Sequence, residues 1–185
     1  MIRRSILLFV FAVLFLPLVA QKMAKVKLYD GRIKMKIPAD WIEMSVEDII
    51  MRYPSIRNPV ASYTSLDRLS DFNAKVSATR WIDEDKELAL QFFKASIYDL
   101  FDKVTVIGEG IKEINGREFI YFEFESYLRG GQASSAERKY SYILYYLEKG
   151  NTMVFSFRCP TRQKKEWYDT AHEMMESIRI KNIQR

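Results

Sequence analysis

The spacing of apolar residues changes along the chain, and each spacing predicts a different kind of element. Ile33, Met35 and Ile37 alternate with lysines, which is the two-residue period of a strand with one wet face. The preceding segment "KVKLYD" has the same character, and Asp30-Gly31 between the two is a hairpin signal. These segments therefore predict a short antiparallel ribbon over residues 25–38.

Three later segments show helical features. Ser45, followed by Asp48, forms a weak capping box and predicts a short helix. A helix of about four turns is predicted from near Asp85 to Phe101. The segment "RQKKEWYDTAHEMMESI" predicts a last helix with Thr161 as its cap. The apolar stripe of this last helix comprises Trp167, Ala171, Met174, Met175 and Ile178.

The remaining apolar segments predict strands. Val60–Asp67 and Asn73–Asp83 are expected to pair, and the long helix is followed by "VTVIGEGIKEI", "REFIYFEFESYL", "KYSYILYYLEK" and "TMVFSFRC". Asn115-Gly116 is the strongest short hairpin signal in the chain. Tight turns between consecutive strands favour an antiparallel sheet, and "REFIYFEFESYL" is apolar on both faces. The predicted fold class is therefore α+β, an antiparallel sheet with helices on both faces (an αβα sandwich).

The first twenty residues have the layout of a secretory signal peptide. Arg3 and Arg4 precede an apolar run, Ser5–Ala20, whose 16 residues are fewer than the ~20 that span a bilayer as a helix. We expect cleavage after Ala20, a single domain over residues 21–185, and an exported protein that is periplasmic or secreted. No stable membrane span remains after cleavage, and an uncleaved N-terminal anchor is the alternative.

Charge and cysteine content narrow the function classes. Of the 29 basic side chains two lie in the first twenty residues, which leaves 27 against 24 acidic side chains. This mild excess contains no dense Lys/Arg block, so no nucleic-acid partner is expected. Cys159 is the only cysteine, which excludes an intrachain disulfide.

The candidate chemistry is sparse. His172 is the only histidine, and a Cys159–His172 enzyme would need a base within hydrogen-bond reach and an activated thiolate, which the sequence does not indicate. Acid-rich Asp83–Glu87 and Glu43–Asp48 lack the spacing of a calcium loop and suit helix N-termini instead. We therefore predict no catalytic residue, no metal site and no cofactor.

Tyrosines crowd two predicted neighbouring strands. Such rings fill the cores of sandwiches, which is the interpretation that we favour, but they also occur at interfaces because they bury a large area with a polar tip. Flanking arginines could orient an anionic partner. The candidate partner or ligand surface comprises Tyr121, Tyr127, Arg129, Arg138, Tyr140 and Tyr142.

From Lys25 to Lys181 the chain resembles the Mog1/PsbP-like family, which includes DcrB-type exported bacterial proteins. The resemblance is carried by the element order, by a strand that ends in "KIPADW" and by a closing helix that ends in "MMESIRI". It implies a small αβα sandwich that serves as a binding, assembly or accessory protein without a shared catalytic centre. No motif here aligns with the partner-binding residues of Mog1 or the metal sites of PsbP, so none is carried over.

These observations predict an exported, non-catalytic accessory or interaction protein of the cell envelope that binds a protein partner. One alternative is a carrier of a small apolar or aromatic ligand in a pocket between sheet and helix, lined by Tyr and Met. The other alternative is the Cys/His enzyme. Trp41, just after the strand end at Pro38, is expected to anchor its loop to the core.

Overall fold

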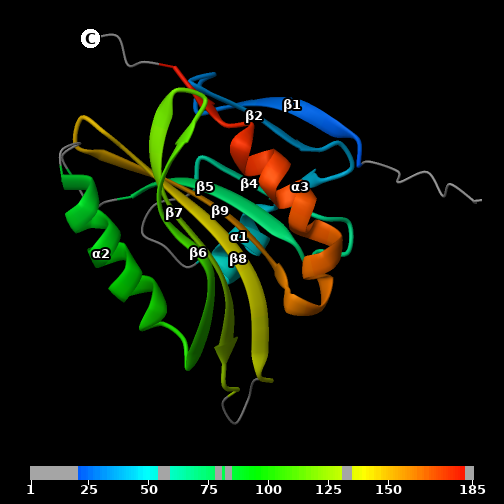
Figure 1. The fold of residues 1–185 in the computed structure, drawn as a ribbon. Helices are drawn as coiled ribbons and strands as arrows, with labels where there is room; N and C mark the ends of the chain where they lie inside the picture. Colours follow the sequence, from blue (N-terminus) through cyan, green and yellow to red (C-terminus); the bar gives the residue numbers. More distant parts are fainter. Residues whose placement is uncertain (1–20, 54–58, 78–80, 82–84, 131–134, 182–185) are drawn as a thin grey trace, which may run out of the picture.

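The computed structural model describes residues 21–53, 59–77, 81, 85–130 and 135–181. The predicted signal peptide lies outside these residues, as does part of the loop predicted after Leu128. The fold contains a seven-stranded sheet of order β3-β4-β5-β9-β8-β7-β6 and a three-stranded sheet of order β1-β2-β10 (Figure 1). The strands are β1 Met23–Leu28, β2 Ile33–Pro38, β3 Ile42–Glu43, β4 Ala61–Thr64, β5 Asp71–Ser77, β6 Lys103–Ile114, β7 Arg117–Leu128, β8 Glu137–Glu148, β9 Asn151–Pro160 and β10 Arg179–Ile180.

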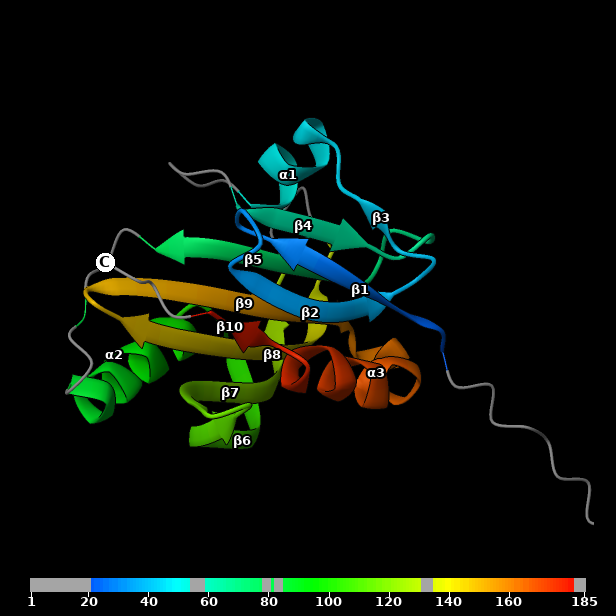
Figure 2. The same ribbon diagram turned by 90° about the horizontal axis from the view of Figure 1, so that it is seen from above.

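Both faces of the large sheet are covered, as the two apolar faces of its strands require. Helix α2 (Lys86–Tyr98) packs on one face, whereas α3 (Lys164–Glu176) and the small sheet cover the other (Figures 1 and 2). On β7, Ile120, Phe122 and Phe124 belong to the core under α2, and Phe119 belongs to the core on the opposite face. The predicted α+β sandwich is confirmed, with a small sheet added to the layer of α3.

The meander of β6 to β9 is antiparallel throughout, as predicted. The β6–β7 turn places Asn115 and Gly116 at φ values of 50° and 77°. A two-residue turn of this kind needs two consecutive residues with positive φ, which Asn and Gly tolerate best. The need for positive φ at both positions therefore explains why Asn115-Gly116 predicted this hairpin correctly.

Several predicted boundaries differ from the observed ones. Helix α1 (Val46–Arg52) begins as predicted, with the Ser45 hydroxyl accepting a hydrogen bond from the Asp48 amide at 3.2 Å. Helix α2 ends at Tyr98, before the predicted end, but Phe101 still packs against the core ring of Phe124. Thr161 does not cap α3.

Thr161 instead begins a 3-10 turn, η2 (Thr161–Gln163), and Gln163 directly precedes the helix. Of the two strands predicted after the short helix, β4 ends at Thr64, before the predicted end at Asp67, and β5 begins at Asp71, two residues before the predicted start. Most of the predicted range after Ser77 lies outside the described residues.

Trp41 lies in the core, as predicted, with 7% of its surface exposed. Its ring stacks on Phe157 of β9 at a centroid distance of 6.1 Å and meets Trp167 of α3 edge-on at 5.3 Å. One loop residue thus joins the large sheet to α3.

The last strand in the sequence, β10, lies beside β2, which is the second. Strand β10 pairs with β2, with Arg179 opposite Lys34 and Ile180 opposite Ile33. The Ser177 hydroxyl accepts a hydrogen bond from the Lys36 amide at 2.8 Å. The segment "SIRI" therefore closes the small sheet rather than merely ending the last helix.

Candidate functional site

The structure divides the six candidate surface residues into separate groups. Tyr140 and Tyr142 are fully buried between β8 and α3. The Tyr140 ring contacts Phe157 and Tyr168, and the Tyr142 ring contacts His172. The surface interpretation is wrong for these two tyrosines, because the last helix covers the face of β8 on which they lie. Their role in the core is confirmed.

Tyr121 is half-buried and packs at the margin of the core that contains Tyr142, whose ring centre lies 5.1 Å from the Lys112 ammonium. Its ring packs over the bulge that interrupts β6 between Val106 and Gly108. A β-carbon built at Gly108 would come within 3.1 Å of this ring, so glycine leaves the room that the ring occupies. The Lys112 ammonium lies 5.3 Å from the ring centroid.

Tyr127 and Arg138 meet at the far end of the meander. They are directly opposite one another on β7 and β8, and the Arg138 guanidinium lies 5.1 Å from the centre of the Tyr127 ring. Arg129 is exposed just beyond β7, where its amide donates a hydrogen bond to Asp102 Oδ2 at 2.6 Å. Arginine over an aromatic face is favourable and leaves the guanidinium edge available to an acceptor.

Tyr127 and Arg138 line a hollow of about 310 Å³, which we call the meander hollow. Within it, Glu125 is held by the Lys164 ammonium at 2.7 Å. The buried hydroxyl of Thr161 has no hydrogen-bond partner among the described residues. The full lining comprises Lys103, Thr105, Glu125, Ser126, Tyr127, Arg138 and Thr161. The hollow thus combines a cation, an aromatic ring and an unpaired hydroxyl.

A buried carboxylate on β7 organises the polar contacts beneath α3. Glu123 is 5% exposed, accepts a hydrogen bond from the Tyr140 hydroxyl at 2.7 Å and lies 3.2 Å from Nε2 of His172. Burial by itself raises the pKa of Glu123, but the hydrogen bonds from His172 and Tyr140 outweigh burial and hold it below its ordinary value. The hydrogen bond to Glu123 in turn raises the pKa of His172, against the opposing effect of burial.

These contacts satisfy a buried charge, and they do not activate a nucleophile. Burial raises the pKa of Cys159 to about 12, which keeps the side chain as a thiol at neutral pH. Burial and the hydrogen bond to Glu123 likewise raise the pKa of Tyr140, which stays a protonated donor. Period-two alternation along "REFIYFEFESYL" places Glu123 on the same strand face as Phe119, but no sequence pattern predicted its role. A carboxylate among the aromatic residues of a covered face was the available signal.

A second and larger hollow, of about 730 Å³, lies against the small sheet and was not predicted. Its basic lining comprises Lys25, Lys27, Lys34, Lys36 and Arg179. Glu173 and Glu176 of α3 and Asn115 of the β6–β7 turn border it. A search for blocks of consecutive basic residues misses this group, because the lysines alternate with apolar residues. The two-residue period places all of them on one face.

The part of the chain that the structure describes lacks a metal-binding cluster and a membrane-spanning helix. It contains no group of three or more His, Cys, Asp or Glu side chains that could hold a metal ion. None of its helices is long and apolar enough to cross a membrane.

No family model matches the chain, and no curated protein matches it in sequence. Solved structures do match its fold. Cyanobacterial PsbP (CyanoP) from Synechocystis sp. PCC 6803 has a TM-score of 0.59 at 11% identity, over 89% of this chain and 96% of that one. The Ran-binding protein Mog1p of Saccharomyces cerevisiae has a TM-score of 0.57 at 14% identity, over 87% and 96%.

LpqN, involved in cell envelope biogenesis of Mycobacterium tuberculosis, has a TM-score of 0.56 at 16% identity, over 87% of this chain and 91% of that one. These identities support a shared architecture and carry no residue from one protein to another. The order of elements and the two covered faces of the meander agree with the αβα sandwich that the sequence resemblance implies. The chain therefore has the Mog1/PsbP-like fold.

Proposed function

We propose that this chain is an exported, non-catalytic accessory protein of the cell envelope that binds a protein partner at the meander hollow. The observation that carries the proposal is the position of this hollow. The ends of β6, β7 and β8 that bear Lys103, Tyr127 and Arg138 project past both α2 and α3 (Figure 1). An exposed arginine next to a half-buried tyrosine suits an interface, where both residue types are enriched.

Two of the similar structures provide precedents for protein binding and for a role in the cell envelope. Mog1p is a Ran-binding protein, so this architecture can bind another protein. LpqN is involved in cell envelope biogenesis, which agrees with the export that the N-terminal sequence predicts. The resemblance to DcrB-type exported proteins within this fold stays a prediction.

A non-catalytic role is supported by the chemistry beneath α3. The carboxylate Glu123 is already bound by Tyr140 and His172, and Cys159 is a buried thiol with a raised pKa. A Cys/His enzyme needs the thiolate form at the site of reaction.

The ligand-carrier alternative finds no support in the hollows described above. It expects an apolar pocket lined by Tyr and Met between the sheet and a helix. Met174, Met175 and Tyr142 are instead fully packed in the core. Most of the residues that line the two hollows are charged or polar, and the two linings contain one methionine, Met35, and one tyrosine, Tyr127.

Site-specific photo-crosslinking in living cells tests the proposal. A benzophenone amino acid replaces Tyr127, and a matched chain carries it at Leu88, which is 62% exposed on α2. We expect a discrete crosslinked protein adduct from position 127, none from position 88, and loss of the adduct when Arg138→Glu is added. Cell fractionation of the same samples shows whether the chain is exported. An absent adduct, or the same adduct from both positions, would contradict the partner site.

A further inference from the structure

Positive charge is concentrated in the small sheet. Residues 21–40 together with 179–181 contain eight lysines and arginines and two aspartates. The rest of the chain after residue 20 has 19 basic and 22 acidic side chains. The mild overall excess therefore conceals a basic small sheet on a domain whose remainder is slightly acidic.

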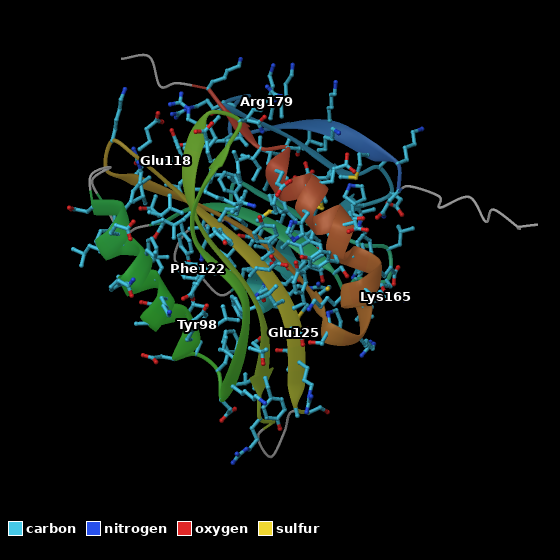
Figure 3. The ribbon with its side chains drawn as sticks, in the orientation of Figure 1. Tyr98, Glu118, Phe122, Glu125, Lys165 and Arg179 are labelled. Carbon is cyan, nitrogen blue, oxygen red and sulfur yellow. The ribbon has the colours of Figure 1, made fainter. Side chains whose placement is uncertain are left out.

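The register of the small sheet places like charges directly opposite one another. Lys25 lies opposite Lys36, Lys27 opposite Lys34, and Lys34 opposite Arg179. All five side chains lie on the outer face, because Val26, Met35 and Ile180 on the same strands pack into the core. Figure 3 shows side chains with nitrogen tips pointing outward at this end, around Arg179.

Little acid compensates this face. Lys36 pairs with Glu173 at 2.8 Å, but among the described residues no ion pair joins Lys25, Lys27, Lys34 or Arg179 to a carboxylate. Like charges directly opposite one another on a sheet lower its stability. An anionic surface laid against this face would offset the repulsion between these basic side chains. Binding to such a surface is therefore electrostatically favourable.

We propose that the outer face of β1-β2-β10 docks on an anionic membrane surface by binding phospholipid headgroups. The basic residues spread over three strands as a broad array, and four of the five are lysines. Lysine is a compact point charge on a flexible stem, which suits a diffuse negative surface better than one bidentate ligand. Each lysine or arginine near an anionic lipid surface contributes about 1 kcal/mol of attraction, or about five-fold in partitioning.

The position of the face in the chain favours a membrane over an acidic protein. Strand β1 begins at Met23, three residues after the apolar run that ends at Ala20. In the precursor the basic face therefore follows directly on the segment that the sequence predicts to enter the membrane during export, and the predicted cleavage after Ala20 releases it at a membrane surface. This step rests on the envelope location in the proposed function, but it does not use the partner site.

The two hollows lie at opposite ends of the meander. Asn115, in the β6–β7 turn, borders the basic hollow, whereas Tyr127, near the other end of β7, lines the meander hollow. Ten residues of strand between Arg117 and Tyr127 separate them by on the order of 30 Å. Docking through the small sheet thus leaves the meander hollow facing away from the membrane (Figure 1).

Vesicle co-sedimentation tests this inference with the full chain in the form that the cell exports, so that any N-terminal segment is common to all samples. One vesicle is phosphatidylcholine alone, and the other contains phosphatidylglycerol as roughly one third of its lipid, which supplies the negative surface charge. We expect binding to the anionic vesicles that falls as salt rises, because ions screen a surface interaction.

The test variant is Lys25→Gln, Lys27→Gln and Lys34→Gln combined, which leaves the Lys36–Glu173 pair intact. Each lysine near an anionic surface contributes about five-fold to partitioning, so the variant should bind on the order of 100-fold more weakly. It should also unfold at the same or a higher temperature, because opposed charges are removed. The matched control makes the same charge change at exposed Lys75, Lys149 and Lys165, outside the small sheet, and should lose much less.

Four results would overturn the inference. Equal binding to both vesicles, or equal losses in the test and control variants, would show that the face has no specific role. Wild-type binding to polyglutamate or to DNA, but not to anionic vesicles, would assign the face to a different polyanion. An adduct at position 127 without vesicle binding would leave the partner site standing while the membrane inference fails.

Discussion

Replacing Trp41 with alanine should strongly destabilise the domain. The side chain is 7% exposed and joins the loop after β2 to both β9 and α3. Truncation of a buried tryptophan costs ~3–5 kcal/mol of unfolding free energy, because it loses burial and leaves a cavity. Its indole nitrogen is buried without a hydrogen-bond partner among the described residues, so removing it recovers part of that cost. We expect a net loss of about 3–4 kcal/mol.

Urea unfolding followed by far-ultraviolet circular dichroism measures this loss without relying on tryptophan fluorescence, which the mutation itself changes. In a domain of this size about 1 kcal/mol corresponds to roughly 2–4 °C in Tm, so thermal unfolding should shift by ~10 °C. The matched variant Trp41→Phe keeps an aromatic ring that can stack on Phe157. It should lose about half as much as the alanine variant.

Two results would refute this reasoning. A loss below about 1 kcal/mol for Trp41→Ala would show that the ring does not hold the layers together. Equal losses for the alanine and phenylalanine variants would show that a smaller ring in contact with Phe157 restores none of the lost stability.

Three further predictions concern the polar cluster, the thiol and the β6–β7 turn. His172→Gln should reduce stability most between about pH 4.5 and 6.5. The raised pKa of His172 contributes stability in full below its ordinary value of 6.5, and this contribution is lost as pH rises. The lowered pKa of Glu123 contributes stability above its ordinary value of 4.5, and this contribution is lost as pH falls. Denaturation at several pH values measures this, and a pH-independent difference would contradict it. Cys159 should resist iodoacetamide at neutral pH in the folded protein and react once urea unfolds it, so rapid native labelling would revive the Cys/His enzyme. Gly116→Ala should cost about 1 kcal/mol in the same denaturation assay, because its φ of 77° strains any residue with a β-carbon, and an unchanged midpoint would argue against this turn geometry.

The candidate surface shows where reasoning from sequence stops. Period-two alternation correctly placed Tyr140 and Tyr142 on one face of a strand. It could not show that α3 covers that face, because the position of a helix over a sheet depends on the packing of the whole domain. Arg138 lies on the same strand as the two buried tyrosines and Tyr127 lies on the neighbouring strand, yet both remain accessible because they lie beyond the end of the helix.

The basic face gives a second example. Each lysine of β1 and β2 was visible in the sequence, and their alternation was read correctly as one wet face. That these basic side chains lie directly opposite one another became visible only in the strand register of the small sheet. There Arg179 lies beside Lys34, although most of the chain separates them in sequence. A net charge counted over the whole chain does not reveal this local excess of basic side chains.

The sequence by itself determined the elements of this protein, their approximate bounds and the faces that become buried. These are local properties, because they follow from the spacing of apolar residues, from turn residues such as Asn115-Gly116 and from caps such as Ser45. Only the tertiary structure decided that β5 pairs with β9, that β10 joins β2, and that Glu123 meets His172. Contacts between residues far apart in sequence depend on how all the buried surfaces fit together at once, and no local pattern encodes that fit.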